Sequence, residues 1–198
     1  MTLTFVAVLV TMWVASDIED NLGLINKGRA EEAVVNLQTA IEAEPENPRA
    51  HELLALAYLR LNKLDSAQTA ATKAAELASD QALSVRITAA RVAIARQNWT
   101  AAARELDKAS SLDAENQEVR LYRGSLHLAR KDYKAAVDTL SPYVTSNPDE
   151  AYGHYYLGLA HYGMKRPDRT VQQFQKFLAL APDAPEAARV ESLLRSIR

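Results

Sequence analysis

The sequence predicts an all-α protein assembled from repeated helical hairpins. Segments of similar character recur at intervals of 34 or 35 residues and begin at residues 28, 62, 97, 131 and 165. Alanine or glycine returns at fixed places within each interval, and proline returns near the end of three of them. A repeat of this length cannot bury its own apolar face, so successive copies are expected to stack into one array.

Small residues mark the places where the two helices of each hairpin approach closely. Two helices approach only where one of them lacks bulk, and the apolar residues around these positions follow helical spacing. In a repeat of 34 residues, position 8 is Ala55, Ala90, Gly124 and Gly158, position 20 is Ala33, Ala67, Ala102 and Ala136, and position 27 is Ala40, Ala74 and Ala109.

Proline and turn-forming residues punctuate the same pattern. Pro45, Pro148 and Pro182 stand at position 32, where a proline cannot continue a helix interior. Gly28 and Asn62 suit the turn inside a hairpin, because both residue types tolerate turn conformations. Each repeat is therefore expected to hold two helices, with a turn between them and a stop at the end.

This pattern resembles the tetratricopeptide repeat over roughly residues 14 to 184. The resemblance implies a right-handed superhelical solenoid of about five helix-turn-helix repeats plus a C-terminal capping helix, with a short hydrophobic N-terminal helix. The array is placed at residues 17–184, after the N-terminal segment 1–16 and before the capping helix 185–198. Its repeats are predicted at about 14–47, 48–82, 83–116, 117–150 and 151–184.

Two repeats depart from the family pattern. In the first, Asp17 and Asn21 occupy positions at which the family has a large aromatic and a small residue. In the fifth, Thr170 and Phe177 replace small residues, which predicts a more open packing of the last hairpin.

The resemblance implies a protein-binding groove lined by the first helix of each repeat. Seven of the eight tyrosines follow residue 120, which predicts that the groove becomes apolar and aromatic toward its C-terminal end. The predicted partner is an apolar or amphipathic segment of another protein, because the positions that clamp a C-terminal carboxylate in one subclass hold unsuitable residues here. Packing between hairpins is an alternative for Tyr133, Tyr143 and Tyr156. The predicted groove residues are Ile87, Arg91, Leu121, Tyr122, Ser125, Leu128, Tyr152, Tyr155, Tyr156, Leu159 and Tyr162, with Arg49, Glu52, Leu56, Leu59, Arg60 and Ile94 completing it.

Composition argues against several other functions. A formal net charge of −2 and a pI near 6.1 leave no excess of cations for a phosphate backbone, so no nucleic-acid partner is expected. The sequence has no cysteine, and its four histidines fall at repeat positions that normally hold packing residues. We therefore expect no catalytic residues, no cofactor and no metal.

Residues 1–16 are apolar and uncharged, unlike the rest of the chain. A run of this length can just span a membrane as a short helix, and Trp13 suits an interface, which favours a retained anchor or a signal-like segment. The alternatives are a cleaved signal peptide, a first helix packed within a soluble array or its groove, and a truncated start. The residues predicted to contact lipid are Phe5, Val6, Val8, Leu9, Val10 and Trp13.

These observations together predict a non-catalytic scaffold or assembly subunit, tethered to a membrane, that binds a partner polypeptide in a tyrosine-rich groove. The repeats are expected on the periplasmic or extracytoplasmic side of a bacterial inner membrane, with a soluble protein as the alternative. A second functional hypothesis is a structural subunit of an integral membrane complex, anchored by its N-terminal helix.

Overall fold

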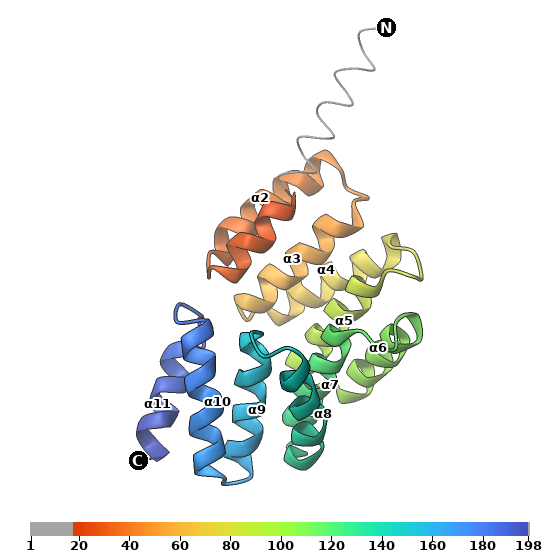
Figure 1. Ribbon diagram of the computed structural model, residues 1–198. Helices are drawn as coiled ribbons and strands as arrows, with labels where there is room; N and C mark the ends of the chain where they lie inside the picture. Colours follow the sequence, from red (N-terminus) through yellow and green to blue (C-terminus); the bar gives the residue numbers. More distant parts are fainter. Residues whose placement is uncertain (1–17, 198) are drawn as a thin grey trace, which may run out of the picture. The chain divides into compact units, whose positions relative to one another are not determined.

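A computed structural model describes residues 18–197 and is helical throughout that range, with no strand (Figure 1). The predicted all-α fold class is thereby confirmed. Residues 18–26 are helical, and ten helices follow. They are α2 (Ala30–Ala43), α3 (Pro48–Arg60), α4 (Leu64–Leu77), α5 (Leu83–Ala95), α6 (Trp99–Leu112), α7 (Gln117–Ala129), α8 (Tyr133–Ser146), α9 (Ala151–Gly163), α10 (Pro167–Leu180) and α11 (Ala187–Ile197).

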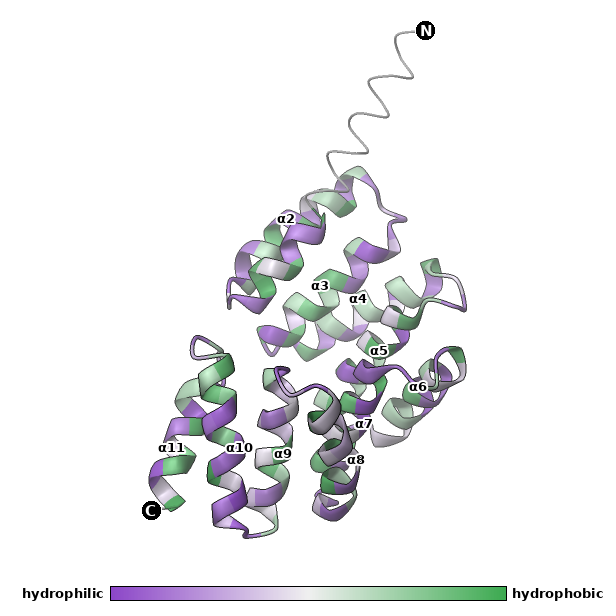
Figure 2. Ribbon diagram, in the orientation of Figure 1, coloured by the Kyte–Doolittle hydropathy of each residue, from purple (hydrophilic) through white to green (hydrophobic). Residues whose placement is uncertain are grey.

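The chain forms two compact units. Unit 1 ends at Val92 and unit 2 begins at Ala93. In unit 1, α3 contacts α2 and α4, while in unit 2 each helix from α6 to α11 contacts the next one along the chain. The labelled helices of both units carry hydrophilic and hydrophobic residues interleaved along their length, as expected of helices that bury one face only (Figure 2).

The turn inside each repeat has one conformation throughout the described chain. Gly28 has φ 78°, and Asn62, Gln97, Lys131 and Lys165, at the same repeat position, have φ between 55° and 61°. In all five turns the next backbone N–H donates to the carbonyl five residues earlier, as from Lys63 to Tyr58 at 2.9 Å. This is the hydrogen bond of a Schellman motif, which ends a helix through a left-handed residue. The turns predicted at Gly28 and Asn62 are confirmed.

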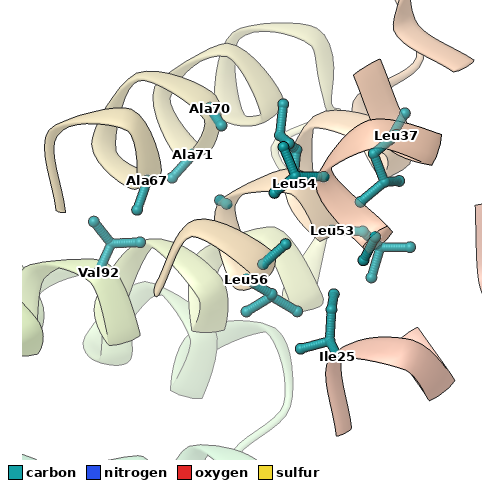
Figure 3. Close-up of a cluster of buried hydrophobic side chains, with 14 of the residues drawn as sticks. Ile25, Leu37, Leu53, Leu54, Leu56, Ala67, Ala70, Ala71 and Val92 are labelled. Atoms are coloured by element: carbon teal, nitrogen blue, oxygen red, sulfur yellow. The ribbon is translucent and has the colours of Figure 1, made fainter. Parts of the chain in front are cut away.

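Alanine packing builds the core of unit 1. Leu37 of α2 and Leu53 of α3 are fully buried, and Ala67 and Ala71 of α4 face the same cluster (Figure 3). Ala33, at the repeat position of Ala67, is also inaccessible to solvent. The absence of bulk at these positions lets α2, α3 and α4 approach closely, as the sequence pattern predicts.

In unit 2, glycine takes the place of alanine where a large side chain crosses between helices. A Cβ atom built on Gly158 of α9 would lie 2.5 Å from Cδ1 of Phe174 on α10. A Cβ atom on Gly124 of α7 would meet the Leu140 side chain of α8 at the same distance. Position 8 must therefore be glycine in these two repeats, because Phe174 and Leu140 occupy the space of its missing side chain.

The prediction of an open fifth hairpin is wrong. Thr170 and Phe177 are both fully buried, although each replaces a small residue. The Thr170 hydroxyl donates to the carbonyl of Arg166 at 2.9 Å, so its polar atom is satisfied within α10. Phe177 packs with Tyr155 and Val190 in one cluster, so α11 supplies apolar surface for the larger ring.

The two ends of the described chain are packed against the array. Ile18 and Ile25 are buried in the unit 1 core, and Asn21 between them is also buried, with its Nδ2 donating to the Ile18 carbonyl. At the other end Val190 of α11 is fully buried, so this helix covers the last hairpin as predicted.

Within the described range of 18–197, none of the helices combines the length and hydrophobicity that crossing a membrane requires. The predicted anchor, with Phe5, Val6, Val8, Leu9, Val10 and Trp13, lies outside the described residues.

Candidate protein-binding face

Helices α7 and α9 contact each other and carry the largest part of the predicted groove. Tyr122, Ser125 and Leu128 of α7 are half-buried, as are Tyr152, Tyr156 and Leu159 of α9. Tyr122 and Tyr156 occupy the same repeat position, as do Ser125 and Leu159, so they lie on equivalent sides of their helices. We call these six residues the α7–α9 face.

Five predicted groove residues are buried in the structure, among them Glu52 at 3% and Leu56 at 5% exposure on α3. Ile87 is 2% exposed, Tyr155 6% and Leu121 8%, so none of them offers contact area to a partner. Burial raises the pKa of the Tyr155 hydroxyl to about 12. The prediction that these five residues line the groove is therefore corrected, because their side chains are buried in the protein interior. The resemblance to the family placed them in the groove by repeat position, but their side chains are covered in the folded protein.

Two further predicted groove residues, Arg91 and Tyr162, are not among the six that define the α7–α9 face. Arg91 is half-buried on α5 and belongs to unit 1. Tyr162, near the end of α9, is 42% exposed and is the most exposed tyrosine of the described chain. It lines a pocket of about 570 Å³ between the α9–α10 turn and the end of α11.

An aromatic cluster fixes the α9 part of the face. The Tyr152 and Tyr155 rings meet edge to face, with centroids 6.1 Å apart, and Tyr155 and Tyr156 are 5.3 Å apart. Phe177 closes the cluster at 5.2 Å from Tyr155. Such pairs prefer edge and offset geometries, so the rings hold one another in place. Tyr152 and Tyr156 are thus presented at the surface by a buried aromatic support.

Four sequence models of known families match the chain. One, described as "TPR repeat", matches residues 24–62, and three, described as "Tetratricopeptide repeat", match residues 48–81, 93–160 and 152–184. This chain is a tetratricopeptide repeat (TPR) protein. No curated protein sequence matches it closely.

Solved structures show the same fold for this TPR protein. TTC0263, a thermophilic TPR protein of Thermus thermophilus, superimposes with a TM-score of 0.78 at 17% identity, over 93% of this chain and 98% of that one. A chain of the APC/C hetero-tetramer Cut9–Hcn1 gives 0.76 at 15% identity, over 93% and 36%. YrrB, described as a TPR protein with an unusual peptide-binding site, gives 0.52 at 16% identity, over 88% and 90%. TPR proteins in general are protein-interaction scaffolds, and this chain has that architecture.

In unit 1 of the TPR protein, an ion network around the buried Glu52 replaces part of the predicted groove. Glu52 is 3% exposed and accepts hydrogen bonds from the hydroxyls of Ser84 at 3.1 Å and Thr88 at 3.2 Å. Arg49 lies 3.0 Å from Glu52 and binds Glu19 through two hydrogen bonds of 2.8 and 2.9 Å. Glu52 therefore joins α3 to α5 and is closed to a partner, which corrects its predicted place in the groove.

Two histidines of the TPR protein hold the turns between repeats. Nε2 of His51 lies 2.8 Å from the carbonyl of Pro45, and Nε2 of His154 lies 2.9 Å from that of Pro148. Both pairs occupy the same repeat positions, so this hydrogen bond belongs to the packing of the repeat. Residues 18–197 contain no cluster of three or more His, Cys, Asp or Glu side chains that could hold a metal ion.

The pocket beside Tyr162 was not predicted from the sequence. Its wall is completed by Gly163, Lys165, Arg166, Pro167, Thr170 and Ile197. The only signal was the substitution of the fifth repeat's turn, where Lys165, Arg166 and Pro167 stand in place of the Lys-Asp-Tyr of the fourth. Ile197 comes from α11, outside the repeat pattern, so no repeat alignment places it there.

Proposed function

We propose that this TPR protein is a non-catalytic scaffold that holds a partner polypeptide on the α7–α9 face. The observation that carries the proposal is the set of three half-buried tyrosines, Tyr122, Tyr152 and Tyr156, on two contacting helices above a rigid aromatic cluster. Tyrosine offers a large contact area with one polar atom and loses little conformational entropy on binding. A rigid support reduces that loss further.

The partner surface that fits this face is an apolar or amphipathic segment. Leu128 and Leu159 contribute apolar area, while the Ser125 hydroxyl can form hydrogen bonds. None of the six residues carries a charge, so burial of apolar area contributes more to binding than ion pairing. A membrane tether in residues 1–16 stays a prediction, and binding on this face does not depend on it.

Site-specific photocrosslinking tests the proposal. A photoreactive amino acid placed at Ser125 should give a discrete adduct with a partner in cells. The same amino acid at Ser141, half-buried on α8, serves as the matched control and should not give that adduct. Identical adducts at both positions, or none at Ser125, would contradict the proposal.

Once the adduct identifies a partner, the contribution of the tyrosines can be measured. Tyr122→Ala in the full chain should weaken binding of the purified partner by roughly 1 to 2 kcal/mol in a calorimetric titration, since a tyrosine anchor contributes about that much or more. Val35→Ala, a truncation at a residue 63% exposed on α2, should leave the affinity unchanged.

A further inference from the structure

The pocket between the α9–α10 turn and the end of α11 combines apolar walls with a cationic rim. Tyr162, Pro167 and Ile197 provide apolar surface, and Lys165 and Arg166 stand at its edge. Its volume of about 570 Å³ is enough for a large side chain and the backbone that carries it. We call it the corner pocket, and it shares no residue with the α7–α9 face.

The cations of this corner have no acidic partner in the part of the chain that the structure describes. Within residues 18–197 no carboxylate pairs with Lys165, Arg166 or Arg169, whereas Lys108, Lys134 and Arg123 each pair with an acidic side chain. Arg166 is the N-cap residue of α10, and Arg169 lies in the first turn of that helix. Asp168 is the single acidic residue in that turn.

The pKa of the neighbouring buried residue His161 reflects the positive charge of this corner. His161 is 3% exposed, and its pKa is lowered by burial, then by Arg169 and Arg166. The amino-terminal end of α10, which has no side-chain cap, adds its partial positive charge at the same place. One corner of unit 2 therefore combines a helix terminus, a pocket with apolar walls and three cations that no carboxylate of residues 18–197 pairs with.

We propose that the corner pocket binds an acidic peptide segment of a partner protein, with an apolar side chain inserted beside Tyr162 and Ile197 and flanking carboxylates held by Lys165 and Arg166. The positive charge at the rim of the corner pocket favours a peptide with an acidic sequence as its ligand. The hollow shape favours an inserted side chain over a flat lipid surface. This site goes beyond the proposed function, because it adds a second, electrostatic contact that uses none of the residues of the α7–α9 face.

A fluorescence anisotropy titration of the full chain tests this inference. The probe is a labelled short peptide in which leucine alternates with glutamate, and a peptide with glutamine in place of glutamate is its control. The acidic probe should bind saturably and more weakly as salt is added, because screening reduces ion pairing at an exposed rim. The glutamine peptide should bind at least about tenfold more weakly, which corresponds to about 1.4 kcal/mol.

Two double variants test whether binding of the acidic probe depends on the corner pocket or on the net charge of the protein. Lys165→Glu with Arg166→Glu should weaken binding of the acidic probe about tenfold or more. Arg130→Glu with Lys131→Glu makes the same charge change at the equivalent turn between α7 and α8 and should leave the affinity within about twofold of the original. Equal losses in both variants, or no binding by the parent chain, would overturn the proposal.

A single variant and a lipid probe complete the test. Tyr162→Ala should weaken the acidic probe severalfold while leaving the thermal stability unchanged, since Tyr162 is among the most exposed apolar residues of the described chain. Vesicles of phosphatidylserine in phosphatidylcholine are the competing ligand. The protein could instead bind these vesicles through Lys165 and Arg166 without binding the peptide. That result would show that the corner pocket contacts a membrane surface and would refute the peptide proposal.

Discussion

The hydroxyl of Tyr152 donates a 2.8 Å hydrogen bond to Oε2 of Glu186 and joins the first turn of α9 to the residue before α11. The last helix of a repeat array has a neighbour on one side only, so each contact that holds it matters more than in a central repeat. Val190 supplies the buried apolar contact of α11, and Tyr152 supplies a polar one. The same tyrosine belongs to the α7–α9 face, which links that face to the packing of the end helix.

Tyr152→Phe should destabilise the protein by about 1 kcal/mol, because it leaves the Glu186 carboxylate without this donor while keeping the ring. The midpoint temperature of thermal unfolding should fall by about 2 to 4 °C, and amide hydrogen exchange in α11 should become faster. Tyr162→Phe is the matched control, since the Tyr162 hydroxyl makes no hydrogen bond within residues 18–197. Equal unfolding temperatures for the two variants would show that the bond does not hold α11.

Glu52→Ala should cost about 2 to 3 kcal/mol of unfolding free energy, measured by urea denaturation. The change leaves the hydroxyls of Ser84 and Thr88 without their buried acceptor. Glu19→Ala removes the other partner of Arg49 at a side chain that is 57% exposed, and should cost less than about 1 kcal/mol. A larger loss of unfolding free energy for Glu19→Ala than for Glu52→Ala would contradict the conclusion that burial makes Glu52 the more stabilising residue of this network.

Gly158→Ala should destabilise unit 2 by about 1 to 3 kcal/mol, because the added methyl group would displace the ring of Phe174. Gly23→Ala provides the opposite case in the helical residues 18–26, where a Cβ atom would meet nothing within 4 Å. There the change should stabilise the protein by about 0.5 to 1 kcal/mol, since alanine favours the helix. In thermal unfolding measurements, the midpoint temperature should fall for Gly158→Ala and rise for Gly23→Ala.

His161 should make folding stability depend on pH near neutrality. Burial, with Arg169 and Arg166, lowers its pKa in the folded protein below the ordinary 6.5, so the unfolded chain binds a proton more readily. Its contribution is therefore complete above about pH 6.5 and is lost as the pH falls from there through the folded pKa.

Denaturation series between about pH 5 and 8 measure this effect. His161→Gln should flatten the dependence over that window, whereas His127→Gln, at the same repeat position on α7 and half-buried, should retain it. A slope that persists unchanged in His161→Gln would assign the dependence to other groups.

The sequence by itself determined the repeat, because its requirements are local. Ala33 and Ala67 recur where helices touch, Gly28 and Asn62 recur where the chain must adopt positive φ, and each requirement returns at a fixed spacing. Gln97, Lys131 and Lys165 adopt the same turn although none of them is a typical turn-forming residue. A family resemblance and a protein-binding role followed from this periodicity.

The tertiary structure alone decided which side chains remain accessible. Repeat position placed Tyr155 and Tyr162 together on one predicted surface, yet one is 6% and the other 42% exposed, because Phe177 and α11 cover the first and leave the second open. Glu52 has a charged side chain that favours solvent, but Ser84 and Thr88, more than thirty residues away, satisfy it in the interior. Periodicity gives the direction of a side chain from its own helix, whereas burial depends on residues contributed by other helices.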